Sequence, residues 1–274
     1  MSVAEQFHVP ANFELKDADA SRKLIGSSTG QKSEDKQADK LQTAALAEQI
    51  SGLQEVFAAN HDHKLLVILQ GMDTSGKDGT VKSVFGQLHP LGARTVAFKA
   101  PSQAEKDRDF LWRVHKEVPG KGEIVIFNRS HYEDVLISKV HGWIDDAECE
   151  RRYAHIRDFE RMLVETGTIV LKFFLHISNA EQKERLEERL ADPDKHWKFD
   201  QQDLAERVHW EAYQRAYEKA LAATDTPEAL WYVVPSDSKT QRNLVIASIV
   251  DERLASLNLK YPPGNLEYSK LIVE

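Results

Sequence analysis

Residues 65–79 read LLVILQGMDTSGKDG. The first five residues are apolar without polar alternation, which is typical of a strand buried on both faces of a parallel sheet. Gly71 to Lys77 follow directly and match the spacing G-x-x-x-x-G-K of a phosphate-binding loop. A helical pattern begins near Gly76, so strand, loop and helix stand in the order that such a loop requires. We therefore expect a phosphate-binding site at the carboxyl end of this strand, the alternative being a plain glycine-rich turn.

The residue types of this loop suit phosphate. Its glycines allow the backbone to curl so that successive N–H groups point inward. The helix that follows adds the positive end of its dipole, and Lys77 supplies a mobile cation for the outer phosphate oxygens. The residues predicted to bind phosphate here are Gly71, Thr74, Ser75, Gly76, Lys77, Asp78 and Gly79.

Two aspartates distinguish this loop from the usual pattern. Asp78 stands where a Ser or Thr hydroxyl normally reaches Mg²⁺. Asp73 places a carboxylate among phosphates, which would repel it unless a metal lay between them. We therefore predict Asp73 as a Mg²⁺ ligand and a catalytic residue, the alternative being a stabiliser of the turn. Asp78 could equally be a first-turn residue that the helix dipole favours.

Four further apolar runs alternate with helical patterns. The expected strands are Leu65 to Leu69, Thr95 to Phe98, Ile124 to Phe127, Ile169 to Leu175 and Leu230 to Val234. The expected helices are 35–60, Lys77 to Gln87, Asp109 to Val118, Asp145 to Glu165, Asn179 to Leu190, Asp203 to Ala223 and Lys239 to Leu257. Strands that alternate with helices form right-handed βαβ units. We therefore predict an α/β fold with a doubly wound, five-stranded parallel sheet.

Neither an internal repeat nor a change of composition marks a second domain. Residues 1–35 hold few apolar groups and several glycines and serines, which is typical of a flexible arm. Residues 36–274 are therefore expected to form one domain.

A second polar cluster follows the third expected strand. Residues 128–134 read NRSHYED, at the sheet edge where open α/β folds bind ligands. Arg129 can clamp a phosphate with two parallel hydrogen bonds. Asn128 stands where phosphate-loop enzymes often place a metal-binding Asp, although it could also cap a helix. Lys99 and Arg242 follow other strands at the same edge and could reach the site, unless they are only surface or capping residues.

Three motifs in this order resemble the polyphosphate kinase 2 family. They are Gly71 to Gly79, Phe127 to Asp134, and Glu188 to Lys198, which reads ERLADPDKHWK. The resemblance runs from about residue 40 to residue 262. It implies a catalytic domain of the P-loop kinase type, in which the third motif belongs to a helical lid at about residues 180–205. It also implies Mg²⁺-dependent transfer of phosphoryl groups between inorganic polyphosphate and nucleotides.

The resemblance assigns roles within these motifs. The predicted catalytic residues are Asp73, Lys77 and Arg129, which would hold the metal and the phosphates at the transfer point. Beyond the loop, the predicted polyphosphate-binding residues are Arg129, Arg185, Arg189, Lys195 and Lys198. The predicted nucleotide-binding residues are Asn128, His131, Tyr132 and Glu133, although His131 could cap a helix and Tyr132 could pack. The NRSHYED version resembles the subgroup that accepts both AMP and ADP, in which Glu133 is linked to acceptance of the monophosphate. Many members of the family carry Asp where this chain has Asn128, and an amide binds metal more weakly than a carboxylate does.

The expected lid is not basic by composition. Residues 181–198 hold five Lys and Arg against six Asp and Glu. Arg185 and Arg189 lie four residues apart, hence on one helix face. A basic stripe and a solvated helix with internal salt bridges both fit this pattern, and only the resemblance favours the stripe. Pro193 is expected to end the helix, and Trp197 to anchor the lid rather than to stack on a base.

The composition disfavours several classes of protein. Of the 274 residues, 41% are apolar and 29% charged, which suits a globular chain. Lys and Arg total 36 against 44 Asp and Glu, and the net charge of −8 disfavours binding to nucleic acid or membranes through bulk positive charge. The single cysteine, Cys149, cannot form an intramolecular disulfide. Because the sequence shows neither a membrane-spanning run nor a signal sequence, we expect a cytoplasmic protein.

The expected activity is reversible transfer of a phosphoryl group from polyphosphate to AMP, ADP or both, with Mg²⁺ or alternatively Mn²⁺. The expected partners are polyphosphate and adenine nucleotides, with guanine nucleotides as an alternative. The resemblance also implies a homo-oligomer, either a dimer or a tetramer. An ATP-dependent nucleoside monophosphate kinase is the alternative activity, because it would share the loop and the lid but bind no long polyanion. A nucleotide-dependent switch protein is disfavoured by Asp73 and Asp78.

Overall fold

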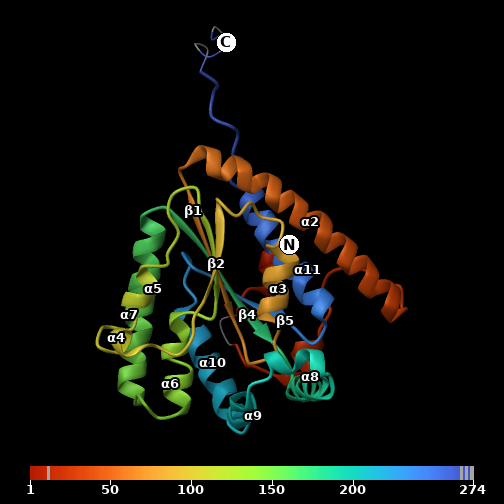
Figure 1. Cartoon of the computed structure of the whole chain (residues 1–274), viewed down its shortest axis with the longest axis vertical. Helices are drawn as coiled ribbons and strands as arrows, with labels where there is room; N and C mark the ends of the chain where they lie inside the picture. Colours follow the sequence, from red (N-terminus) through yellow and green to blue (C-terminus); the bar gives the residue numbers. More distant parts are fainter. Residues whose placement is uncertain (11–12, 266–267, 269–270, 272–274) are drawn as a thin grey trace.

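A five-stranded sheet forms the centre of the computed structural model, which describes residues 1–10, 13–265, 268 and 271. Its strand order is β2-β3-β1-β4-β5, and all neighbouring strands are parallel (Figure 1). The strands are β1 (Lys64–Gln70), β2 (Ala93–Ala97), β3 (Ile124–Asn128), β4 (Thr168–His176) and β5 (Trp231–Pro235). The predicted parallel α/β sheet is confirmed.

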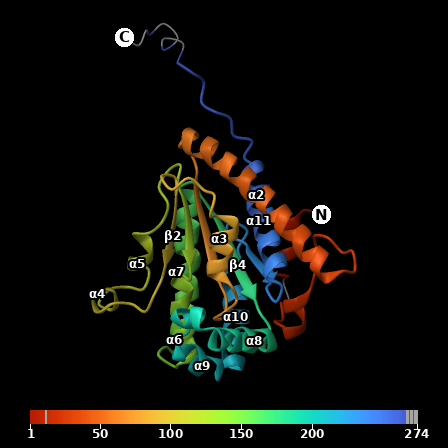
Figure 2. The ribbon, with the colours of Figure 1, turned by 45° about the vertical axis from the view of Figure 1, so that its right-hand side comes forward.

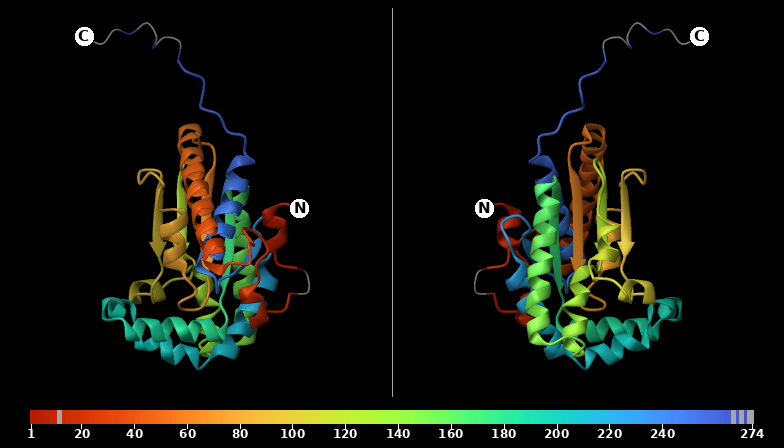
Figure 3. Two further views of the ribbon diagram at one scale, coloured as in Figure 1. Left: turned by 90° about the vertical axis from the view of Figure 1, so that its right-hand side faces the viewer. Right: turned by 90° about the vertical axis from the view of Figure 1, so that its left-hand side faces the viewer.

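Helices cover both faces of this sheet (Figures 1 and 3). One face carries α2 (Lys32–Asn60), α3 (Lys77–Val84) and α11 (Lys239–Ala255), and the other carries α6 (Ile137–Val140), α7 (Asp146–Glu165) and α10 (Trp210–Thr224). Each face of the sheet has its own apolar core, and alternate residues of β1 point into one or the other. Leu65 and Val67 face α2 and α11, whereas Leu66 and Ile68 face α7 and α10. Both faces of the strand are therefore apolar, which explains its unbroken run. Among the described residues, no helix has the length and apolar character that crossing a bilayer requires.

The expected lid crosses the carboxyl ends of the strands (Figures 2 and 3). It consists of α8 (Asn179–Ala191), the 3-10 turn η3 (Pro193–Lys198) and α9 (Gln201–Arg207). The helix end at Pro193 is confirmed. The single helix predicted from Asp203 to Ala223 is wrong, because α9 ends before Val208 and α10 starts at Trp210.

Contacts of Glu206 explain this break. The Tyr213 hydroxyl donates to the Glu206 carboxylate at 2.6 Å, and His141 Nε2 lies 2.9 Å from the same group. These partners come from α10 and from the end of α6. They hold the last turn of α9 against α10 and the end of α6.

The helix predicted from Asp109 to Val118 is also wrong in length. Helical turns are found only at α4 (Gln103–Lys106) and α5 (Trp112–His115). The Asp109 carboxylate accepts a hydrogen bond from the Leu111 N–H at 3.0 Å, which forms a turn. Arg94 Nη2 of β2 donates to the Glu117 carbonyl at 2.9 Å, so this oxygen is bound by a strand residue rather than by a helical N–H. Contacts with neighbouring elements thus override the helical pattern.

Residues 3–9 of the predicted arm pack against the domain. Phe7 in α1 (Val3–Phe7) and Val9 are each 4% exposed and belong to the two apolar cores. The Val9 N–H donates to the Trp231 carbonyl of β5 at 3.1 Å. The flexibility of this arm stays a prediction. Phe7 and Val9 nevertheless attach its first residues to the two apolar cores. The following helix begins at Lys32, slightly before the predicted domain boundary.

Candidate active site

The predicted phosphate loop joins β1 to α3. Its backbone has positive φ angles at Gly71 (154°), Thr74 (63°) and Gly76 (105°). A Cβ atom at Gly76 would lie 1.9 Å from Arg242 Nη1, so both conformation and space require glycine there. Lys77 Nζ donates to the Gly71 carbonyl at 2.7 Å, which folds the side chain back over the loop. Burial and the nearby Arg129 charge lower the pKa of Lys77, and a bound phosphate would reverse this.

The two polar motifs meet at the carboxyl ends of β1 and β3, as predicted. Arg129 Nη2 donates to Asp73 Oδ1 at 2.5 Å. Asn128 Nδ2 donates to Asp78 Oδ1 at 2.6 Å. Arg129 has a φ of 62°, a strained conformation for a residue that carries a side chain. Strain of this kind persists where the surroundings over-determine the backbone, which is common at functional sites.

Carboxylates surround Arg129. Burial by itself lowers its pKa, but Glu133 and Asp73 outweigh this effect and raise it. The Gln70 side-chain amide lies 3.0 Å from Glu133 Oε1. Burial raises the pKa of Glu133, although Arg129 and Lys77 oppose the shift. Glu133 therefore belongs to the charge cluster at the loop.

A cavity of about 860 Å³ lies at the carboxyl edge of the sheet; Asn128 lines it, whereas Glu133 is not among the lining residues. Its walls include Asp73, Lys77 and Arg129, with Arg189, Lys195 and Lys198 from the lid. Beyond β2 the lining residues are Ala97, Phe98, Lys99 and Ala100, and at the start of α11 they are Lys239 and Arg242. Lys239 was not predicted, although it also follows a strand at the edge where ligands bind.

Arg185 lines the cavity, but its guanidinium is engaged within the protein. It is 5% exposed, and its Nε–H donates to Glu181 at 2.7 Å. Its Nη1 reaches the carbonyls of residues 74 and 75 at 2.9 and 3.4 Å, and its Nη2 reaches those of residues 236 and 237 at 2.8 Å each. These contacts use all five N–H groups of the guanidinium. Arg185 thus ties the lid to the phosphate loop and has no donor left for polyphosphate.

His131 and Tyr132, by contrast, are not among the residues that line the cavity. They are 0% and 1% exposed, inside the domain. The Tyr132 hydroxyl donates to Glu160 at 2.8 Å, and Lys172 Nζ donates to the same carboxylate at 2.6 Å. Ser130 caps the following 3-10 turn η2 (His131–Asp134), so the chain turns inward directly after Arg129. We therefore remove both side chains from the predicted nucleotide site.

Asp203 is a cavity residue that the sequence did not indicate. It lies on α9, with Oδ2 at 3.3 Å from Arg189 Nη1. Burial and the nearby Asp73 charge raise the pKa of Asp203 to about 6. No sequence signal points to it, because it enters the site only through the packing of the lid.

The side chains of the site could supply only part of the ligands of a metal ion. Within the part of the chain that the structure describes, no cluster of three or more His, Cys, Asp or Glu could cage a metal. Mg²⁺ is commonly held by one or two carboxylates together with substrate phosphates and water. The Asp73 carboxylate, at the mouth of the phosphate loop, fits that kind of site.

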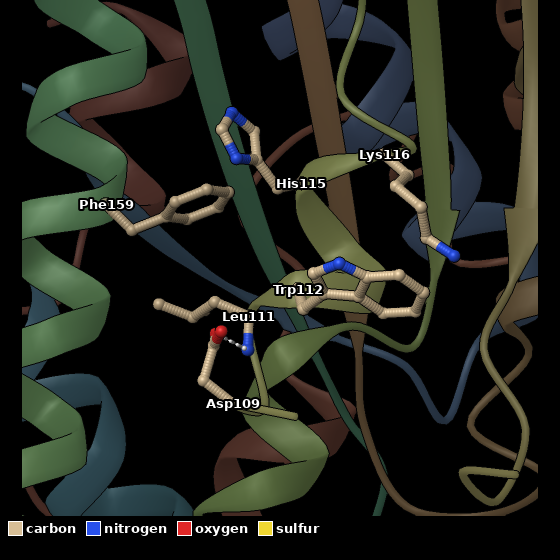
Figure 4. Close-up of a pocket in the computed structure, with 6 residues that line it drawn as sticks. All are labelled: Asp109, Leu111, Trp112, His115, Lys116 and Phe159. Carbon is tan, nitrogen blue, oxygen red and sulfur yellow. Dashed lines mark hydrogen bonds between the residues drawn. The ribbon is translucent and has the colours of Figure 1, made fainter. Parts of the chain in front are cut away.

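A smaller hollow of about 360 Å³ lies beside α5 (Figure 4). Its wall includes Trp112, His115 and Phe159. Arg108 Cζ and Lys116 Nζ already lie over the Trp112 ring, at 4.3 and 3.7 Å from its centroid. The hollow shares no lining residue with the phosphate cavity. The phosphate cavity is therefore the candidate active site.

The chain matches the family model described as Polyphosphate kinase 2 over residues 33–261. It is 48% identical over 231 residues to the AMP/ADP-polyphosphate phosphotransferase of Meiothermus ruber, which covers 84% of this chain and 86% of that protein. It is 40% identical to the ADP-polyphosphate phosphotransferase of Rhodopseudomonas palustris, over 78% of each chain. The crystal structure of Polyphosphate Kinase 2 from Arthrobacter aurescens matches with a TM-score of 0.93 at 42% identity, covering 98% of this chain and 95% of that one. The chain therefore belongs to the polyphosphate kinase 2 family.

Proposed function

We propose that this enzyme transfers a phosphoryl group from inorganic polyphosphate to AMP and ADP. The observation that supports this most strongly is the extent of positive charge along the cavity. Cations continue beyond the phosphate loop on the lid, at Arg189, Lys195 and Lys198, and beyond β5, at Lys239. In all, nine Lys and Arg residues line the cavity against five Asp and Glu, an excess of positive charge that suits a polyanionic chain.

The cavity is also polarised along the sheet. Most of its apolar lining, Ala97, Phe98 and Ala100, lies at the end of β2 together with Lys99, and Trp197 adds an apolar ring from the lid. Lys239 and Arg242 lie beyond β5 at the other edge. The flat faces of a nucleotide base pack against apolar side chains, whereas a phosphate chain is charged throughout. We therefore place the acceptor nucleotide on the β2 side, the donor chain on the β5 side, and the transfer point at Lys77 and Arg129 between them.

Positioning and charge neutralisation would supply most of the rate. The acceptor's terminal phosphate oxygen is ionised near neutral pH, so its attack requires no strong base. Lys77 and Arg129 would bind the oxygens of the transferred group and hold donor and acceptor in line. Asp73 would hold Mg²⁺, which neutralises phosphate charge when bound. The lid would exclude water, which otherwise diverts transfer into hydrolysis.

Glu133 supports the acceptance of both AMP and ADP. Its carboxylate lies in the charge cluster around Arg129 and Lys77. A carboxylate at this place could hold a water molecule in the space that the shorter phosphate group of AMP leaves.

The test is nucleotide formation from long-chain polyphosphate, Mg²⁺ and either AMP or ADP, without added ATP. We expect ADP and ATP from AMP, and ATP from ADP. Product from only one acceptor would still identify polyphosphate as the donor, but it would contradict the use of both AMP and ADP as acceptors. Absence of product, with transfer to AMP restored by ATP, would instead establish the alternative nucleoside monophosphate kinase.

Substituting Arg189 with alanine is expected to weaken polyphosphate binding more than nucleotide binding. Arg189 lines the cavity from the lid, and a lost charged hydrogen bond typically costs about tenfold in affinity. The apparent KM for polyphosphate should rise about tenfold, while that for ADP changes less than about twofold. Lys183→Ala is the matched control, because Lys183 lies on the same helix, pairs with Glu187 and is absent from the cavity wall. Equal effects of the two substitutions would show that Arg189 is only a surface residue.

Asp203 is expected to make polyphosphate binding depend on pH. Because its pKa is raised to about 6, the carboxyl is neutral below that pH and charged above it. The charged form repels the polyanion and neutralises Arg189. We therefore expect the apparent KM for polyphosphate to rise between about pH 5 and pH 7 in the wild type, and to rise less in Asp203→Asn. Identical pH profiles of KM in the two proteins would refute this role.

A further inference from the structure

Two buried arginines lie side by side beneath the phosphate loop. Arg185 comes from α8 in the lid, and Arg242 from the first turn of α11. Both donate to the Ser75 carbonyl, Arg185 at 3.4 Å and Arg242 at 2.9 Å. Arg185 is 5% and Arg242 2% exposed, and both residues line the cavity.

Their hydrogen bonds differ in number. Arg185 uses all five of its N–H groups within the protein. Arg242 Nε and Nη2 donate to the Asn243 side-chain oxygen at 3.1 and 2.9 Å, and its Nη1 donates to Ser75. Over the described part of the chain, the contacts of Arg242 therefore use three N–H groups. One N–H remains on each terminal nitrogen.

Their charges are also compensated differently. Arg185 pairs with Glu181 at 2.7 Å. None of the ion pairs among residues 1–10 and 13–265 includes Arg242. Burial and the neighbouring Arg185 charge lower the pKa of Arg242 to about 9. A buried charge without a counter-charge is unfavourable, so the geometry leaves a place for an anion.

The position of Arg242 indicates which anion would bind. A Cβ atom at Gly76 would lie 1.9 Å from its Nη1, and one at Gly79 would lie 3.2 Å from its Nη2. The guanidinium thus lies against the end of the loop and the first turn of α3, where backbone N–H groups bind phosphates. Lys239 lies on the same side of the cavity, and the apolar residues that suit a nucleoside lie on the other.

We propose that Arg242 binds the phosphate chain of the donor through its two remaining N–H groups, whereas Arg185 only braces the loop. The proposal rests on the proposed function, because it takes polyphosphate as the donor. The donor's charge then supplies the counter-charge that Arg242 lacks in the protein. A guanidinium on this side of the loop suits a continuing chain of phosphates, in place of the sugar and base of a nucleoside triphosphate.

The test compares Arg242→Gln, Arg242→Lys and Arg185→Gln with the wild type. Equilibrium binding of long-chain polyphosphate and of ADP is measured separately, together with the melting temperature. Arg242→Gln should weaken polyphosphate binding at least about tenfold and ADP binding less than about twofold. Arg242→Lys keeps the charge and should recover part of the loss. Arg185→Gln should instead lower the melting temperature and affect both ligands alike.

The salt dependence of binding gives an independent readout. One fewer cation on the polyanion should reduce the slope of log affinity against log salt by about one in Arg242→Gln. Equal losses of polyphosphate and ADP affinity, with an unchanged salt slope, would overturn the proposal, because Arg242 would then only support the loop. If the wild type forms no ATP from polyphosphate and ADP, the proposed function fails; if it does so and Arg242→Gln binds polyphosphate normally, only this proposal fails.

Discussion

Lys77→Ala is expected to lower the rate of phosphoryl transfer on the order of a thousandfold. The side chain is 8% exposed and lies over the loop, where its ammonium group contacts carbonyl oxygens in the absence of substrate. A bound phosphate would offer it charged oxygens instead. Alanine removes this cation, and no neighbouring side chain of the loop carries a positive charge that could replace it. The measurement is the initial rate of ATP formation from polyphosphate and ADP.

The control for this substitution lies on the same helix. Lys82→Ala removes an exposed lysine of α3 that does not line the cavity, and it should leave the rate unchanged. Both proteins should unfold at nearly the wild-type temperature, because neither lysine makes an ion pair among the described residues. A Lys77→Ala enzyme with near-normal turnover would contradict the assignment of the phosphate loop.

Glu160→Ala is expected to cause the largest loss of stability, about 3–5 kcal/mol in the free energy of unfolding. Glu160 and Lys172 are 1% and 0% exposed and pair at 2.6 Å. Burial raises the pKa of Glu160, but Lys172 and His131 outweigh this effect and lower it. Removing the carboxylate leaves a buried lysine without a counter-charge. Urea denaturation at neutral pH would measure the loss.

A double substitution separates the charge effect from the loss of packing. Glu160→Leu with Lys172→Met replaces the pair by apolar groups and leaves no unpaired charge, so it should recover about half of the lost stability or more. If the double variant were as unstable as Glu160→Ala, the loss would come from packing and from the Tyr132 hydroxyl rather than from the uncompensated charge.

The sheet could be predicted because its signal is local. Each strand is a short apolar run, and burial on both faces needs no knowledge of the partner element. The loop from Gly71 to Lys77 was readable for the same reason, since the motif, the strand and the helix are contiguous. The helix lengths were less predictable: the break after Arg207 depends on contacts of Glu206 with α6 and α10, which lie outside the helical pattern.

The site residues, too, could be predicted only where their placement follows from the local sequence. Arg129 and Asp73 were predicted together, because both follow strands that end at one edge of the sheet. Arg185 and Arg189 share a helix face and both line the cavity, yet Arg185 donates to backbone carbonyls of the phosphate loop, whereas Arg189 pairs with Asp203. Periodicity along one helix cannot distinguish these positions. The burial of His131 depends on Glu160, 29 residues away in the sequence.

The saturated guanidinium of Arg185 has a consequence for protein engineering. Together with the Gln182 amide, which donates to the Asp73 carbonyl at 3.1 Å, it attaches the first two turns of α8 to the phosphate loop. Those turns therefore belong structurally with the loop that they hold. A chimaera that exchanges lids between relatives should be joined at Pro193, because a junction at the start of α8 would also replace the scaffold of the loop.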